Sequence, residues 1–168
     1  DLLARNVSEN QDDEEKAMDS ATRMSWYGLP LVKGEKSSLA SSFTCLQAQV
    51  ELRKGALGNA LETLRSAESD LHPSIYLNNI GCIHHGLRNH NCAAAYFARA
   101  LEACFSRTVS KSADPENVAL QISFNLGVQL LRCKKPIPAY RCFMEAASAY
   151  YHQPKLWLRV AECVVMAH

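Results

Sequence analysis

The feature that most constrains this chain is a spacing of small and apolar residues that occurs twice, around two glycines. Counted from Gly81, such residues stand at −4, −1, +12, +16 and +19, and the same offsets from Gly127 give similar residues. Position +3 is His84 in the first copy and a leucine in the second. The other members are Leu77, Ile80, Ala93, Phe97 and Ala100 in the first copy, Ser123, Leu126, Leu130, Ala139, Phe143 and Ala146 in the second, and Trp157, Val160, Ala161 and Val164 in a partial third copy further along the chain.

These offsets predict two helices joined by a short turn. Positions −4, −1, 0 and +3 share one face of a helix, because neighbours on a helical surface are three or four residues apart. A small residue at 0 lets the second helix approach closely, and alanines at +12 and +19 flank the aromatic side chain at +16 for the same reason. Asn89 suits the turn in one copy, and Pro136 and Pro138 suit the turn in the other, with Pro138 at a first helical position.

The second copy and the partial third copy are 34 residues apart, measured from Ser123 to Trp157. A helix pair repeated at a period of about 34 residues is the signature of the tetratricopeptide repeat. Each pair buries its apolar face by stacking on its neighbours, and such stacks typically bind other chains. The sequence therefore predicts an all-α tetratricopeptide-repeat solenoid of antiparallel helix pairs over residues 43–168, with three pairs and a final unpaired helix. The predicted repeats are residues 43–73, 74–109 and 115–151, followed by a partial repeat at 154–168.

Two parts of the predicted solenoid depart from the pattern. Ala60, Leu64 and Ala67 repeat the second-helix pattern, but only Ala48 is of the expected kind at the preceding first-helix offsets. We therefore expect a degenerate first repeat with a turn of altered length. The separation of Gly81 from Gly127 exceeds one repeat period by about a dozen residues. The sequence thus predicts an insertion around 106–117, as a loop or as extensions of both flanking helices.

Charge is spread unevenly along the chain. Residues 1–20 hold seven acidic and two basic residues, a net charge of −5, so the remaining 10 acidic and 16 basic residues carry +6. Residues 1–42 are predicted to be an acidic head followed by a linker containing Ser, Gly and Pro, partly disordered or loosely packed. The chain does not begin with Met, and we expect it to be part of a longer protein.

Seven cysteines without a CxxC motif predict reduced thiols in an intracellular protein. No apolar run approaches the ~20 residues that a membrane helix needs. We therefore expect the protein in the cytoplasm, with the nucleus as a second location.

One cluster of residues has the chemistry of a metal site, namely Cys82, His84, His85, His90 and Cys92. Its spacing does not give the paired ligands from converging elements that zinc requires, and His84 is better explained as a packed histidine with one hydrogen bond. A Cys–His nucleophile from the same residues would have no group to orient it and no oxyanion hole. HExxH and GxSxG motifs are absent from the sequence. We therefore predict no enzymatic activity, no metal and no cofactor.

The surface expected to bind partners is a groove lined by the first helix of each pair. Positions one, five and eight after the aligned −4 residue do not face the paired helix, and they are mixed to apolar. Such a groove suits an amphipathic helix. Cochaperone repeats that hold a C-terminal carboxylate carry Lys and Asn there, and the Lys is absent here. The candidate groove residues are Asn78, Cys82, His85, Phe124, Val128, Leu131, Leu158, Glu162 and Val165.

Basic residues form a second candidate site at the predicted turns. Together they predict a basic edge along the turn side of the stack, which is either a contact surface for RNA or a solvated rim. No aromatic residue is interleaved among them to stack on bases. The candidate basic residues are Arg53, Lys54, Arg88, Arg132, Lys134 and Lys135.

Several segments are more specific than the repeat pattern requires. They are YLNNIGCIH at 76–84, FNLGVQLL at 124–131, PAYRCF at 138–143 and PKLWLRVAEC at 154–163. The sequences of these segments resemble those of the family of Not-ten subunits of the Ccr–Not mRNA deadenylase complex. The resemblance covers residues 74–168 well, 43–73 only as a generic repeat, and 1–42 not at all.

This resemblance implies a non-catalytic scaffold subunit. In that family the subunit pairs with the Not-eleven subunit and docks on the N-terminal part of the large Not-one scaffold, while other subunits carry the deadenylase activity. The alternative reading is an unrelated tetratricopeptide-repeat adaptor or cochaperone that binds short peptides or amphipathic helices.

Overall fold

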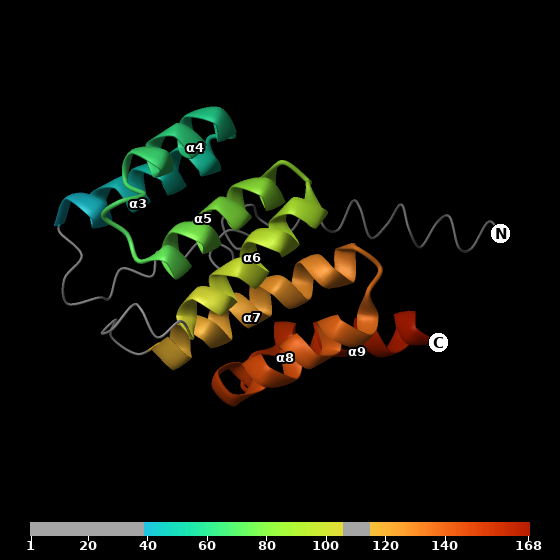
Figure 1. Cartoon of the computed structure of the whole chain (residues 1–168). Coiled ribbons are helices and arrows are strands. Elements are labelled where there is room, and N and C mark those ends of the chain that lie inside the picture. Colours follow the sequence, from blue (N-terminus) through green and yellow to red (C-terminus); the bar gives the residue numbers. More distant parts are fainter. Residues whose placement is uncertain (1–38, 106–114) are drawn as a thin grey trace, which may run out of the picture.

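The computed structural model describes residues 39–105 and 115–168, and over these ranges all regular structure is helical (Figure 1). The predicted all-α, tetratricopeptide-type fold is therefore confirmed. The predicted head and the centre of the predicted insertion lie outside the described residues. The helices are α3 (Leu39–Arg53), α4 (Leu57–Ser66), α5 (Pro73–Gly86), α6 (His90–Cys104), α7 (Pro115–Arg132), α8 (Pro136–Tyr150) and α9 (Pro154–Ala167).

Each helix packs on the next one along the chain, so the helices form a continuous stack (Figure 1). The buried apolar side chains fall into three neighbouring clusters. The first lies among α3, α4 and α5, and the second runs from α5 through α6 and α7 to α8. The third joins α7, α8 and α9. No helix among the described residues is long and apolar enough to cross a membrane.

The repeat glycines mark the closest approach of two paired helices. A Cβ atom added to Gly81 would lie 2.8 Å from Cε1 of Phe97, and one added to Gly127 would lie 2.8 Å from Cε1 of Phe143. Both phenylalanine side chains are completely buried. Each aromatic ring therefore sits directly on the bare backbone of the partner helix, which explains why a small residue at position 0 and an aromatic at +16 occur together.

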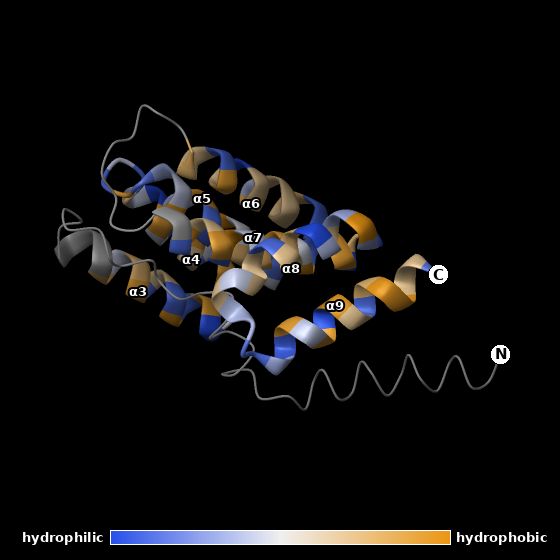
Figure 2. Cartoon of the chain, turned by 90° about the horizontal axis from the view of Figure 1, so that it is seen from below, coloured by the Kyte–Doolittle hydropathy of each residue, from blue (hydrophilic) through white to orange (hydrophobic). Residues whose placement is uncertain are grey.

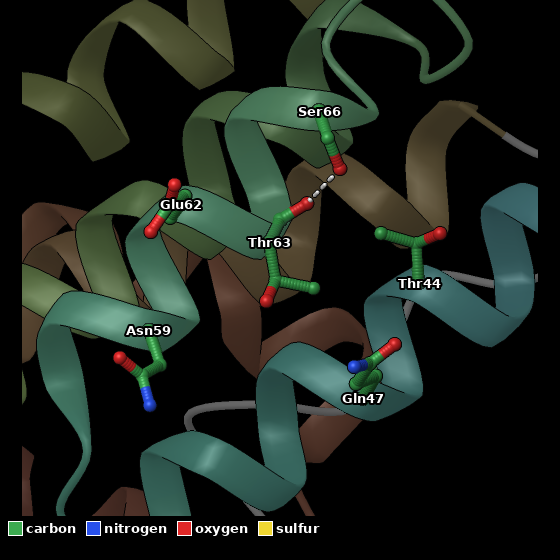
Figure 3. Close-up of a pocket in the computed structure, with 6 residues that line it drawn as sticks. All are labelled: Thr44, Gln47, Asn59, Glu62, Thr63 and Ser66. Carbon is green, nitrogen blue, oxygen red and sulfur yellow. Dashed lines mark hydrogen bonds between the residues drawn. The ribbon is translucent and has the colours of Figure 1, made fainter.

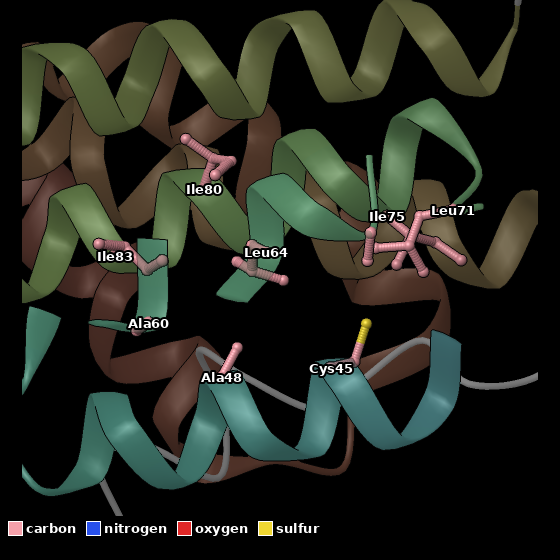
Figure 4. Close-up of a cluster of buried hydrophobic side chains, with 9 residues drawn as sticks. Cys45, Ala48, Ala60, Leu64, Leu71, Ile75, Ile80 and Ile83 are labelled. Carbon is pink, nitrogen blue, oxygen red and sulfur yellow. The ribbon is translucent and has the colours of Figure 1, made fainter. Parts of the chain in front are cut away.

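In the first repeat, the corresponding positions of the two helices carry side chains of different sizes from those in the other two repeats. Ala48 and Leu64 occupy the positions of the glycine and the phenylalanine, and both are buried in the first cluster (Figure 4). Because leucine is smaller than phenylalanine, the α3 position can carry a methyl group. The α3 helix also buries Cys45, one turn before Ala48.

All three helix pairs are joined by the same three-residue turn. Its middle residue has a positive φ, 80° at Gly55, 57° at Arg88 and 56° at Lys134. In each turn the amide of this residue donates to the carbonyl three residues earlier, and the next amide donates to the carbonyl five residues earlier, at 2.9 to 3.1 Å. This is the Schellman pattern that ends a helix. The expected change of turn length in the first repeat is therefore wrong, since the same bond pattern fixes the same length.

Three further details concern where the helices begin. The α5 helix begins at Pro73 and α7 begins at Pro115, so the stretch ahead of the repeat glycine is one turn longer in α7, and part of the insertion extends that helix. The first helical residue of α8 is Pro136, and the expectation that Pro138 takes this position is wrong. Asn89 caps α6, as its side chain accepts a hydrogen bond from the amide of Cys92 at 3.4 Å.

We predict that Gly81→Ala lowers the free energy of unfolding by about 1–3 kcal/mol, because the new methyl group overlaps the Phe97 ring. Urea denaturation measures this loss. Gly58→Ala is the control, since a Cβ there meets nothing within 4 Å. The double variant Gly81→Ala/Phe97→Leu copies the Ala48–Leu64 pair and should recover part of the loss. An unchanged stability of Gly81→Ala would contradict the close approach.

We also predict that Lys134→Gly raises the free energy of unfolding by about 0.5–1 kcal/mol, because a left-handed backbone costs every residue except glycine. Arg88→Gly should act in the same direction. Gly55→Ala should do the opposite and lower the stability by about 1 kcal/mol. Thermal unfolding of the three variants, compared at one pH and salt concentration, gives the signs, and a destabilised Lys134→Gly would refute the argument.

Candidate protein-binding surface

The nine candidate groove residues do not form one open surface. Five of them are buried, with exposed fractions of 0% for Asn78, 4% for Cys82, 5% for Phe124, 2% for Val128 and 7% for Leu131. The expectation that these five line an open groove is therefore wrong. First helices pack on more than their own second helix, so positions that face away from the pair still become buried.

On α7 the three candidates belong to the core of the last repeats. Phe124, Val128 and Leu131 lie in the cluster that joins α7, α8 and α9. The ring of Phe124 packs edge-on against Phe143 at 5.4 Å and against Tyr150 at 6.2 Å between centroids. These side chains stabilise the stack, and a partner cannot reach them without opening it.

Cys82 on α5 lies beside a cavity of about 20 Å³ between α3, α4 and α5. Burial raises the pKa of its thiol to about 12. Burial likewise raises the pKa of Cys142 to about 11, with the nearby Glu145 carboxylate adding to the effect. A nucleophilic cysteine needs the opposite shift, because the thiolate is the reactive form. These two thiols are therefore protonated at neutral pH.

Asn78 belongs to a chain of buried amides that links the first helices of the three pairs. Asn125 on α7 donates through Nδ2 to Oδ1 of Asn78 at 3.1 Å, and Asn78 donates to Oδ1 of Asn79 at 3.4 Å. Asn79 in turn donates to the sulfur of Cys45 on α3 at 3.7 Å. Asn79 and Asn125 both stand two positions before the repeat glycines. Each therefore connects its helix to the first helix of the preceding pair.

His85 takes part in a second polar contact between repeats. Oε1 of Gln129, on α7, lies 3.1 Å from Nδ1 of His85 and 3.0 Å from Nδ1 of His90. Gln129 itself is completely buried. Gln129 and Asn125 were not among the residues predicted to form a site. The sequence did contain a pattern that could have predicted their role. Asn125 and Gln129 are two polar residues four positions apart, on one side of a helix whose neighbouring residues are mostly apolar.

The ring of His84 stacks on Tyr96, with centroids 5.0 Å apart and planes 11° apart. It is thus a packed histidine, as expected. Its buried Nδ1 has no hydrogen-bond partner among the described residues, so the expected hydrogen bond is wrong for that atom. Within residues 39–105 and 115–168, no group of three or more His, Cys, Asp or Glu side chains is arranged to hold a metal ion.

The candidates on α9 are the accessible ones. Leu158 is 55% exposed and Val165 is 76% exposed, while Glu162 is partly exposed and binds Arg159 through both carboxylate oxygens at 2.7 and 2.8 Å. Figure 2 shows hydrophobic (orange) colouring along α9, mainly toward its C-terminal end. We name this surface the α9 face, and its exposed apolar residues are Trp157, Leu158, Val164, Val165 and Met166.

A polar hollow of about 310 Å³ lies between α3 and α4 (Figure 3). It includes none of the candidate residues. Ser66 at its rim donates to the carbonyl of Thr63 at 2.8 Å. The hollow offers amides, hydroxyls and one carboxylate, which is not a set that defines a catalytic site. Its lining residues are Thr44, Gln47, Asn59, Glu62, Thr63 and Ser66.

All six candidate basic residues are exposed and lie in or directly beside the three Schellman turns. Figure 1 places these turns on one side of the stack. Lys54 forms an ion pair with Glu51 at 3.0 Å, which neutralises one of the six charges. We name this surface the turn edge, and its residues are Arg53, Lys54, Arg88, Arg132, Lys134 and Lys135.

The stack of helix pairs with glycine–aromatic contacts, together with an exposed apolar helix face, defines a helical-repeat protein of the tetratricopeptide type. No family model matches the chain. Its sequence is similar to CCR4-NOT transcription complex subunit 10 of Danio rerio, at 29% identity over 151 residues that cover 73% of this chain and 24% of the relative.

Two other relatives have related names. Subunit 10-B of Xenopus laevis is 29% identical over 150 residues, covering 73% of this chain and 20% of the relative. Subunit 10 of Drosophila melanogaster is 32% identical over 98 residues, covering 54% of this chain and 15% of the relative. The resemblance expected from the sequence is therefore confirmed. The chain spans about a quarter or less of the length of these relatives.

The difference in burial between two candidate valines predicts that the same substitution changes the free energy of unfolding by very different amounts. Val128→Asp places a carboxylate in the core and should lower the free energy of unfolding by more than ~4 kcal/mol. Val165→Asp, at the most exposed of the candidates, should change it by no more than ~0.5 kcal/mol. Circular dichroism with urea titration compares them. Similar stability of the two variants would show that Val128 is not part of the core.

Proposed function

We propose that this chain is a non-catalytic assembly subunit of a CCR4-NOT type complex that acts in mRNA deadenylation. The observation that supports this most directly is the similarity to subunit 10 of that complex over about three quarters of the chain. A stack of repeats with a packed core and accessible faces suits a protein that holds other chains together. The proposed partners are chains like the Not-one and Not-eleven subunits, and the proposed location is the cytoplasm, with the nucleus second.

The α9 face supports partner binding, and it includes Leu158 and Val165 from the predicted groove. Four of its five residues are 45–55% exposed and Val165 is more so. Trp157 is held at the start of α9 by a hydrogen bond from Nε1 to the carbonyl of Tyr151 at 2.7 Å. Tryptophan is among the residues that most often provide a large share of the binding free energy when they are buried at the centre of an interface. We therefore propose that an amphipathic helix of a partner subunit packs on this face.

Leu158→Asp/Val165→Asp should abolish capture of Not-one-like and Not-eleven-like chains from a native extract, with the capture read by mass spectrometry. Both side chains are exposed, so helicity and thermal stability should stay at the unsubstituted values. Ile137→Asp is the matched control, because Ile137 is an apolar residue on α8 that is 63% exposed. This control should capture the same chains as the unsubstituted protein.

Two results would contradict the proposal. If the unsubstituted chain recovers chaperones and binds an acidic C-terminal peptide in place of these subunits, the adaptor or cochaperone alternative is favoured. If the double variant captures the subunits as well as the control does, the complex membership stands and the α9 face is not its interface.

A further inference from the structure

We propose that the turn edge binds the phosphate backbone of single-stranded RNA. This inference rests on the proposed function, since it gives an RNA-processing assembly a direct contact with its substrate class, but it assigns a different surface from the α9 face. Three observations carry it: the position of the charges, the lack of ion pairs at several of them within the described residues, and the backbone on which two of them stand.

The position follows from the repeat architecture. Each Schellman turn joins the first and second helix of a pair, and successive pairs place these turns on the same side of the stack (Figure 1). The three turns that carry the basic residues therefore lie in one row (Figure 1). Among the described acidic residues, only Glu51 lies in the last helical turn before one of these turns. Glu68, Asp70 and Glu102 lie toward the opposite ends of their helix pairs.

Several of these cations have no carboxylate partner among the described residues. In the part of the chain that the structure describes, no ion pair involves Arg88, Lys134 or Lys135. All three are exposed, so their charges are available to a ligand. A row of positive charge of this kind attracts polyanions over a distance set by the salt concentration.

The backbone gives an independent indication. The first turn has glycine in the left-handed position, but the second has Arg88 and the third has Lys134 there. A left-handed backbone costs a non-glycine residue free energy, so long basic side chains stand where stability alone favours glycine. A residue held against a conformational cost is a reason to consider a role in binding.

Single-stranded RNA fits this row better than an acidic protein segment does. It carries one negative charge at every nucleotide, so flexible cations meet a phosphate whatever the register of the strand. An acidic segment would need its carboxylates placed to match the turns. Because cations on phosphates carry no sequence information, the binding should be strongly salt-dependent and indifferent to base sequence.

The test is fluorescence anisotropy of a labelled 20-nucleotide oligo(A) RNA with the purified full chain, titrated over a range of salt. The test variant is Arg88→Gly/Lys134→Gly/Lys135→Gln, which removes three charges while relaxing two left-handed positions. It should weaken binding at least ~10-fold at low salt and make the log–log salt slope shallower by ~2, since each phosphate contact on a single strand contributes ~0.7.

The matched control is Arg65→Gln/Arg99→Gln/Arg141→Gln, which removes the same charge from exposed positions within α4, α6 and α8. It should keep the affinity within ~2-fold. Equal weakening by the two variants would overturn the inference, because net charge and not the turn edge would then govern binding. So would absence of RNA binding at low salt, or a preference of the edge for a poly-glutamate peptide.

This experiment separates the inference from the proposed function. If the chain captures the CCR4-NOT type subunits but does not change the anisotropy of the labelled RNA, the turn-edge inference alone is refuted. A chain that binds RNA through the turn edge but captures no such subunit refutes the proposed function alone.

Discussion

The structure depends on one contact, in which a large side chain of the second helix sits on the bare backbone of the first. In two pairs this contact joins glycine to phenylalanine, and in the first pair it joins alanine to leucine. Because interiors are close-packed, the size on one helix fixes the size on the other. The distance within each pair follows from this contact, and the identical Schellman turns follow from helices that end at the same distance beyond it.

Neighbouring helix pairs are also connected by buried hydrogen bonds, in addition to apolar contacts. Buried amides connect α7 to α5 and α5 to α3, and Gln129 connects α7 to two histidines near the α5–α6 turn. Buried polar groups need their hydrogen bonds, so a shift of one helix along its neighbour would leave several of them unpaired. Apolar contacts therefore provide the stability of the stack, while the amides specify its register. The two surfaces proposed to bind partners are chemically distinct, since the α9 face is apolar and the turn edge is cationic.

Much of the fold was predictable from spacing alone. The offsets from Gly81 and Gly127 give both helices of each pair and the residue in contact at position +16, because a helical period depends only on neighbours three and four positions apart. The groove was predictable only in part. Asn78, Phe124 and Val128 hold the expected positions on their helices, but their exposure depends on how closely the next helices pack, and the spacing within one helix contains no such information.

The sequence by itself determined the helix pairs, the matched sizes at positions 0 and +16, and the recurrence of basic residues near the turns. Local periodicity and residue volume are sufficient for these, since they act within a single helix pair. Only the tertiary structure decided which side chains a partner can reach, that all three turns have the same length, and that Gln129 joins two repeats. These depend on contacts between segments far apart in the chain, such as those that carry His85 and Gln129, and no local pattern specifies how closely such segments approach.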